Sequence, residues 1–80
     1  MTFYVKHVSE LLRRAGADPT PRNKELLDRA IREVLDMDRA DAPVVWEKVK
    51  EIMFSGNDPD RKRDFEEEVV RRMIKYLITG

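Results

Sequence analysis

The 80-residue chain contains no cysteine. Disulfide bonds, thiol nucleophiles and cysteine-ligated zinc or iron–sulfur sites are therefore excluded. No uninterrupted apolar run exceeds three residues, which is far too short to span a membrane. The N-terminus also lacks the apolar segment of a signal peptide, so we expect a cytoplasmic protein.

The chain has no excess of either charge, because 16 Lys and Arg residues balance 16 Asp and Glu residues. This balance disfavours a nucleic-acid-binding protein, which normally carries surplus positive charge. Charged residues make up 40% of the chain, yet the apolar fraction of 41% is enough to form a core. Glutamine is absent and arginine outnumbers lysine, a composition typical of thermophile proteins and of engineered sequences.

The longest amphipathic pattern spans Asp58 to Ile78. Asp58 can cap a helix here, and Pro59 suits its first position. The apolar residues recur at helical spacing: Phe65, Val69, Val70, Met73, Ile74 and Leu77. This arc is too wide for one partner, so we expect the earlier helices to pack against a central C-terminal helix.

Three shorter stripes predict three further helices. The first begins after Thr2 and ends before Gly16, with a strand over residues 3–8 as the alternative; its stripe is Tyr4, Val5, Val8, Leu11, Leu12 and Ala15. The second is capped by Thr20 and carries Leu26, Leu27, Ala30, Ile31, Val34 and Leu35. The third is capped by Asp41, ends before Gly56 and carries Val45, Val49, Ile52 and Met53.

Together these patterns predict an all-α protein with one helical domain over residues 1–80. The helices are unequal and their connectors differ, which favours an irregular, partly orthogonal bundle of four helices. One extra helical turn between Asp36 and Ala40 would make five, and the sequence leaves that alternative open.

Three consecutive cations, Arg61, Lys62 and Arg63, fall in the first turn of the last helix. With the free N–H groups there they could contact a phosphate. However, acidic residues are interleaved with the basic ones along this helix, and we expect the pairs Glu67–Arg71 and Glu68–Arg72. Nucleic acid is therefore an improbable partner, because its binding requires unpaired cations.

Three apolar side chains, Phe3, Val44 and Phe54, lie off the stripes. They predict either an interaction surface for a protein partner or a homodimer, or local packing at helix ends. The only histidine, His7, is expected to pack partly on Leu11 rather than to catalyse or bind a metal.

Asp36, Asp38 and Glu47 have the spacing of three calcium ligands in an EF-hand loop. The loop glycine is missing and Pro43 interrupts the pattern, so helix capping is the favoured interpretation.

No catalytic set, cofactor motif or metal cluster emerges from the sequence, and we expect no enzyme activity. Caps, stripes and turn residues agree along the chain, as in sequences built to specify one structure. We therefore hypothesise a very stable helical domain, melting above ~80 °C, whose only demonstrable property is folding, as in an engineered protein. The alternative is a natural protein-interaction module from a thermophile, and a weak nucleic-acid binder ranks third.

Overall fold

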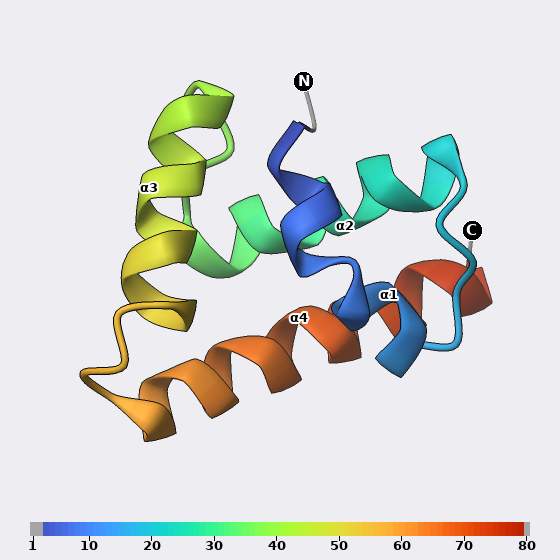
Figure 1. The fold of residues 1–80 in the computed structure, drawn as a ribbon. Helices are drawn as coiled ribbons and strands as arrows, with labels where there is room; N and C mark the ends of the chain where they lie inside the picture. The colour runs from blue at the N-terminus through green and yellow to red at the C-terminus, as the bar shows by residue number, and fades with distance from the viewer. Residues whose placement is uncertain (1–2, 80) are drawn as a thin grey trace.

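The structure is a computed structural model that describes residues 3–79 (Figure 1). Within this range it has four α-helices and no strand, so the predicted all-α class is confirmed. The helices are α1 (Glu10–Arg14), α2 (Pro21–Leu35), α3 (Ala42–Met53) and α4 (Pro59–Thr79), and a 3₁₀ helix, η1 (Phe3–Val8), precedes them. The described part of the chain fills 33 × 25 × 20 Å.

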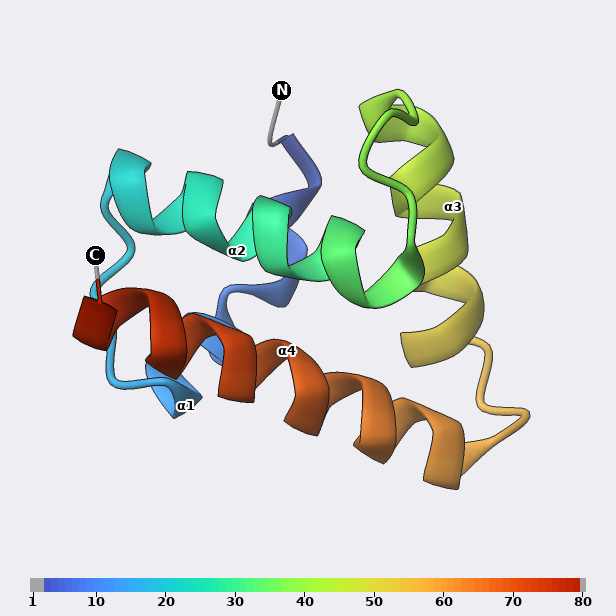
Figure 2. The ribbon, with the colours of Figure 1, turned by 180° about the vertical axis from the view of Figure 1, so that it is seen from behind.

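The helix α4 runs along the molecule and contacts α1, α2 and α3. Its neighbour α2 lies beside it in the opposite direction, so the start of α2 is next to the end of α4 (Figures 1 and 2). The third helix, α3, stands steeply to both at one end of the pair, and η1 contacts α2 and α3. An irregular bundle around a central α4 stays a prediction.

The N-terminal segment is not the continuous α-helix that the sequence predicted, and the alternative strand over residues 3–8 is wrong too. A 3₁₀ helix is followed by a turn at Ser9 and then the short α1. Within η1, Val5 and Val8 are spaced by three, and a 3₁₀ helix places such residues along one edge. Both are buried, as is Leu11 of the following α1. The predicted cap Thr2 lies outside the described residues.

Most helix-end predictions are confirmed. The Thr20 hydroxyl accepts a hydrogen bond from the Asn23 N–H at 3.2 Å, and the Asp58 carboxylate accepts one from the Arg61 N–H at 3.0 Å. Gly16 and Gly56 both have positive φ angles, +78° and +74°, as left-handed helix ends require. Asp41 is the exception, because it precedes α3 without forming a side-chain cap bond.

The connector between α2 and α3 is a turn, so the extra helix between Asp36 and Ala40 is wrong. Asp36 has φ +57°, the left-handed conformation more usual for glycine at this position. The Met37 N–H donates to the Arg32 carbonyl at 2.8 Å, and Ala40 N–H donates to the Met37 carbonyl at 3.2 Å. These hydrogen bonds pair backbone groups at the end of α2 and turn the chain towards α3.

The core collects apolar residues from every element. Its buried members include Tyr4, Val5, Val8, Leu11, Leu12, Leu27, Ala30, Ile31, Val45, Val49, Ile52, Met53, Phe65, Val69 and Met73. The predicted α4 stripe is only partly correct, because Ile74 and Leu77 are 42% and 38% exposed. Met73 is 0% exposed and Tyr76 packs against the core, so the second half of α4 is covered as well, and Ile74 and Leu77 lie at the edge of the arc that faces away from this packed side. None of the described helices is both long and apolar enough to cross a membrane.

Burial in the middle of α4 leads to a matched test. Val69 is 0% exposed, and Val69→Asp puts an unpaired charge into the core, at a cost of several kcal/mol that exceeds ordinary stability margins. We expect this variant to lose its helical circular dichroism signal at 25 °C, while Ile74→Asp on the same helix stays folded. A folded Val69→Asp variant with an unchanged melting point would show that α4 is misplaced.

Candidate functional site

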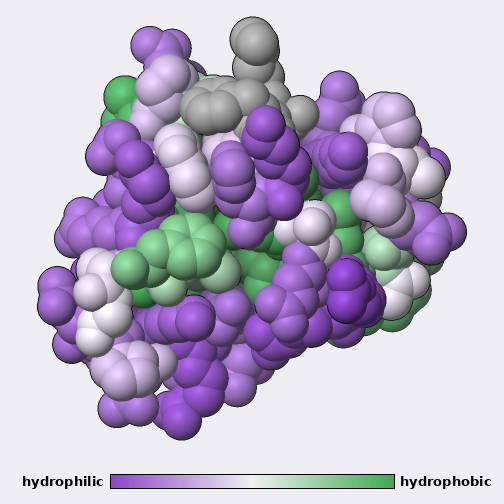
Figure 3. Space-filling model, in the orientation of Figure 1, coloured by the Kyte–Doolittle hydropathy of each residue, from purple (hydrophilic) through white to green (hydrophobic). Residues whose placement is uncertain are grey.

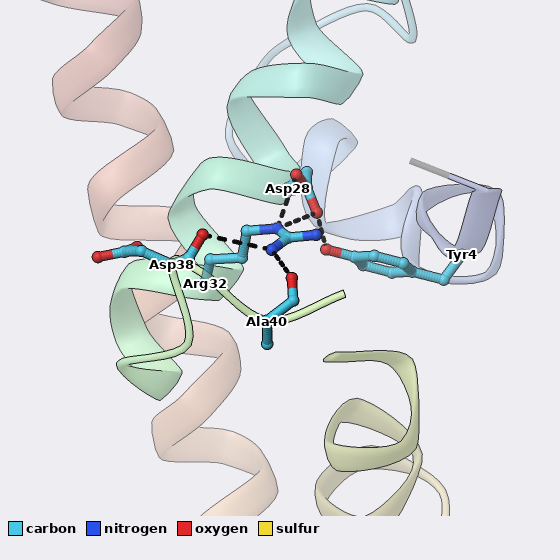
Figure 4. A network of polar contacts seen from close by, with 5 residues as sticks. All are labelled: Tyr4, Asp28, Arg32, Asp38 and Ala40. Carbon is cyan, nitrogen blue, oxygen red and sulfur yellow. Dashed lines mark hydrogen bonds and ion pairs between the residues drawn. The ribbon is translucent and has the colours of Figure 1, made fainter. Parts of the chain in front are cut away.

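A partly buried polar network joins η1, α2 and the turn before α3 (Figure 4). The Tyr4 hydroxyl donates a hydrogen bond to the Asp28 carboxylate. The Arg32 Nε donates to the two oxygens of the same carboxylate at 3.1 and 3.0 Å. Its Nη1 donates to the Ala40 carbonyl and reaches the Asp38 carbonyl at 3.5 Å. One carboxylate and one guanidinium thus hold three chain segments together.

The network favours a protonated Tyr4. Burial, followed by the hydrogen bond and the negative charge of Asp28, raises the Tyr4 pKa well above its ordinary value of 10.0, and the Arg32 charge opposes this only in part. Tyr4 therefore stays protonated near neutral pH and acts as a hydrogen-bond donor to Asp28. Asp28 and Arg32 are spaced i, i+4 on α2, and their side chains are only 16% and 14% exposed.

An aromatic surface, which we define as His7, Trp46 and Phe54, lies where η1 meets α3. The His7 ring stacks on Trp46 at 5.1 Å, and the Phe54 ring meets Trp46 edge-on at 6.0 Å. The other stacking partner of Trp46 is the buried Tyr4, at 6.1 Å. On the face shown in Figure 3, apolar surface gathers near the C-terminal end of α3 and continues into the centre of the face. His7 thus has a partner on another helix, which the expected contact with Leu11 did not include.

The three predicted interaction residues do not form one patch. Phe54 is 56% exposed and belongs to the aromatic surface. Val44 is 52% exposed but lies near the opposite end of α3, roughly 15 Å away along the helix. The Phe3 side chain lies outside the described part of the structure. Trp46 completes the aromatic surface. In the sequence it lies on the flank of the third stripe, and no other feature marks it.

The predicted phosphate contacts are largely engaged with carboxylates. Arg61 lies 3.7 Å from Glu51 on α3, and Arg63 lies 3.5 Å from Asp60. Lys62 is exposed and has no carboxylate partner among the described residues. Further along α4, Arg71 pairs with Glu68 at 2.8 Å instead of Glu67.

The predicted Glu68–Arg72 pair does not form in the described residues, and the Arg72 Nε is buried without a hydrogen-bond partner. Arg72 lies on the same side of α4 as the buried Phe65 and Val69, so packing against α2 removes it from the solvated face.

A cleft of about 390 Å³ lies at the corner where the end of α2, α3 and the start of α4 meet. Its apolar floor is formed by Val34, Leu35, Ile52 and Phe65, and its polar rim by Lys48, Arg61, Asp64 and Glu68. The volume is within the range of small-ligand pockets. The sequence did not predict it, because a cleft depends on how three helices meet and not on any one stripe.

The calcium interpretation gains no support from the geometry. Asp36 ends α2, and Glu47 lies within α3, where it pairs with Lys50 at 2.7 Å. Residues 3–79 contain no group of three or more side chains placed to hold a metal ion.

No family model matches the chain, and neither a curated protein nor a solved structure matches it.

The Tyr4 environment predicts a specific loss of stability at alkaline pH. Because the folded-state pKa is raised, the unfolded chain releases this proton first, so stability is full below about pH 10 and falls above it. The slope is about 1.4 kcal/mol per pH unit for one such group. Tyr4→Phe starts about 1 kcal/mol less stable but should lack this component, whereas the control Tyr76→Phe should keep it. Parallel losses in urea titrations of all three proteins would refute the assignment.

The pairing of the α4 cations predicts weak nucleic-acid binding. Duplex DNA or RNA should bind no tighter than ~100 µM at physiological salt, the weak limit for nonspecific binders. Fluorescence anisotropy at two salt concentrations measures this directly. Micromolar affinity that falls steeply with salt and disappears in Arg61→Glu/Arg63→Glu would establish a nucleic-acid role instead.

Proposed function

We propose that the protein is a very stable, non-catalytic helical domain of the cytoplasm that acts by binding another protein. This is the sequence alternative of a protein-interaction module, and it keeps the high stability of the leading hypothesis, in which folding is the only property of the domain. The finer arrangement belongs to the proposal as well: an irregular bundle in which α4 is central. The contacts of α4 with α1, α2 and α3 support that arrangement.

The roles of the titratable side chains support a non-catalytic function. Tyr4, Asp28 and Arg32 are committed to one another and to the turn before α3. His7 is held flat against Trp46. These are the groups that proton-transfer chemistry would draw on, and each has a structural partner instead.

The observation that carries the binding proposal is the exposed Phe54 ring on a fixed support. Phe54 is 56% exposed and meets Trp46 edge-on, while Trp46 stacks on the buried Tyr4. Lys50 lies 5.5 Å from the centre of the Trp46 ring and adds a cation to the same surface. A pre-positioned aromatic residue is the usual energetic centre of a protein interface, because little conformational entropy is lost on binding.

Pull-down with immobilised protein tests the proposal, using a matched pair of exposed substitutions on α3. Phe54→Ser should abolish capture of a protein partner that the unchanged chain retains, whereas Val44→Ser should have little effect. Truncating a central aromatic contact typically costs 2 kcal/mol or more, roughly a thirtyfold loss of affinity. If neither the unchanged chain nor Val44→Ser retains any specific protein, the hypothesis of a domain that only folds is favoured.

A further inference from the structure

The neutral chain is divided into an acidic end and a basic end. Along α4 and its cap, residues 58–68 carry six acidic and three basic side chains, whereas residues 69–79 carry three basic and no acidic ones. This order suits the helix macrodipole, since negative charge gathers near the N-terminus and positive charge nearer the C-terminus. The zero net charge therefore conceals a polarity along the longest helix.

The packing of α2 extends this polarity to the whole molecule. Because α2 is antiparallel to α4, residues 21–29 lie beside residues 69–79 (Figures 1 and 2). We call these two segments the basic end; together they contain six basic and two acidic residues. Residues 30–68, which we call the acidic end, contain twelve acidic and seven basic residues.

The basic end carries an uncovered apolar stripe. Leu77 and Ile78 follow Ile74 by three and four positions, so the three side chains lie on one side of α4. They are 42%, 38% and 79% exposed, and Arg71 and Lys75 flank them on the same helix. We refer to Ile74, Leu77 and Ile78 as the C-terminal stripe. Although α4 otherwise packs against other helices, these three side chains remain in contact with solvent. The protein therefore lacks the free energy that burying their apolar surface would provide.

The acidic end carries the apolar cleft described above. Two of its rim residues are acidic, Asp64 and Glu68. The two rim cations are both directed at one neighbour, since Lys48 and Arg61 lie 3.6 and 3.7 Å from Glu51. Asp64 itself lies 4.0 Å from Arg63, at the limit of an ion pair. The cleft thus offers an apolar floor and two exchangeable carboxylates, which are complementary to the C-terminal stripe and its flanking cations.

We propose that the C-terminal stripe of one copy docks in the cleft of a second copy. Ile74, Leu77 and Ile78 then cover the apolar floor, while Arg71 and Lys75 approach Asp64 and Glu68. Ile74 begins six residues, or roughly 9 Å of helix, beyond Glu68, the last α4 residue of the cleft, so the apolar stripe cannot reach the cleft of its own copy. The contact is heterologous, and it extends head to tail into short chains instead of closing as a symmetric dimer.

Charge distinguishes this arrangement from a stripe-to-stripe dimer, in which the Arg71 and Lys75 side chains of both copies would repel one another. Within one copy Arg71 already pairs with Glu68, and these side chains are 72% and 46% exposed. A surface pair this exposed contributes little to stability, so exchanging partners between copies costs little. The contact is small, and we expect weak association that salt screening reduces.

Sedimentation velocity of the full chain at low and physiological salt tests the proposal with charge-swapped variants. The basic-end variant is Arg71→Glu/Lys75→Glu, and the acidic-end variant is Asp64→Lys/Glu68→Lys. All four positions are outside the buried core, and circular dichroism verifies that each variant is folded. The unchanged chain should show a sedimentation coefficient that rises with concentration at low salt, and Ile78→Ser should reduce this rise.

Each charge-swapped variant alone should sediment as a monomer, and an equimolar mixture of the two should associate again, because each end then meets its complement. Phe54→Ser should leave self-association unchanged, which separates this inference from the proposed protein-binding surface. A monomer under all conditions overturns the inference. So does a dimer that the acidic-end variant does not weaken, or a mixture that stays monomeric.

Discussion

The Asp28 carboxylate is the group on which the arrangement of the chain most depends. It lies at the edge of the apolar core, where a charge without partners would cost several kcal/mol. Tyr4 supplies one donor from η1 and Arg32 supplies two contacts from within α2. The hydrogen bond from Tyr4 forms only when the N-terminal segment is folded against α2. A requirement of this kind selects one packing among the several that apolar stripes alone would allow.

The same network reaches α3 from both sides. Arg32 bonds the carbonyl of Ala40, which fixes the turn from which α3 starts. Tyr4 stacks on Trp46, which in turn supports His7 and Phe54. The exposed aromatic surface is thus the outer layer of a series of contacts that begins at the partly buried Asp28 carboxylate. The polar network supports the Trp46 ring on which the proposed binding residue Phe54 packs.

The sequence predicted the features that local chemistry decides. The caps at Thr20 and Asp58 and the left-handed glycines were correct, because each depends on a few neighbouring residues. The exposure of Phe54 was predicted from its angle on the third stripe. The 3₁₀ geometry of η1 was missed, since a spacing of three is compatible with both helix types until packing decides between them.

The features that escaped prediction depend on distant segments. The i, i+4 spacing of Asp28 and Arg32 is typical of a surface ion pair. The two side chains are partly buried because Tyr4, from a distant segment, contacts Asp28. Ile74 and Leu77 have the spacing of core residues, yet α4 turns them away from the side on which Met73 and Tyr76 pack against the core. The cleft likewise exists only because α2, α3 and α4 meet at one corner. Such features are determined by helix lengths and crossings, which periodicity does not specify.

A double-mutant cycle between Tyr4→Phe and Asp28→Asn tests the central claim most directly. Urea unfolding of the unchanged chain, the two single variants and the double variant gives the coupling free energy between these side chains, 24 positions apart in the chain. A coupling of about 1 kcal/mol or more is expected if the Asp28 carboxylate organises the N-terminal segment. Free energies that add to within about 0.3 kcal/mol would contradict the account, because the two side chains would then act independently.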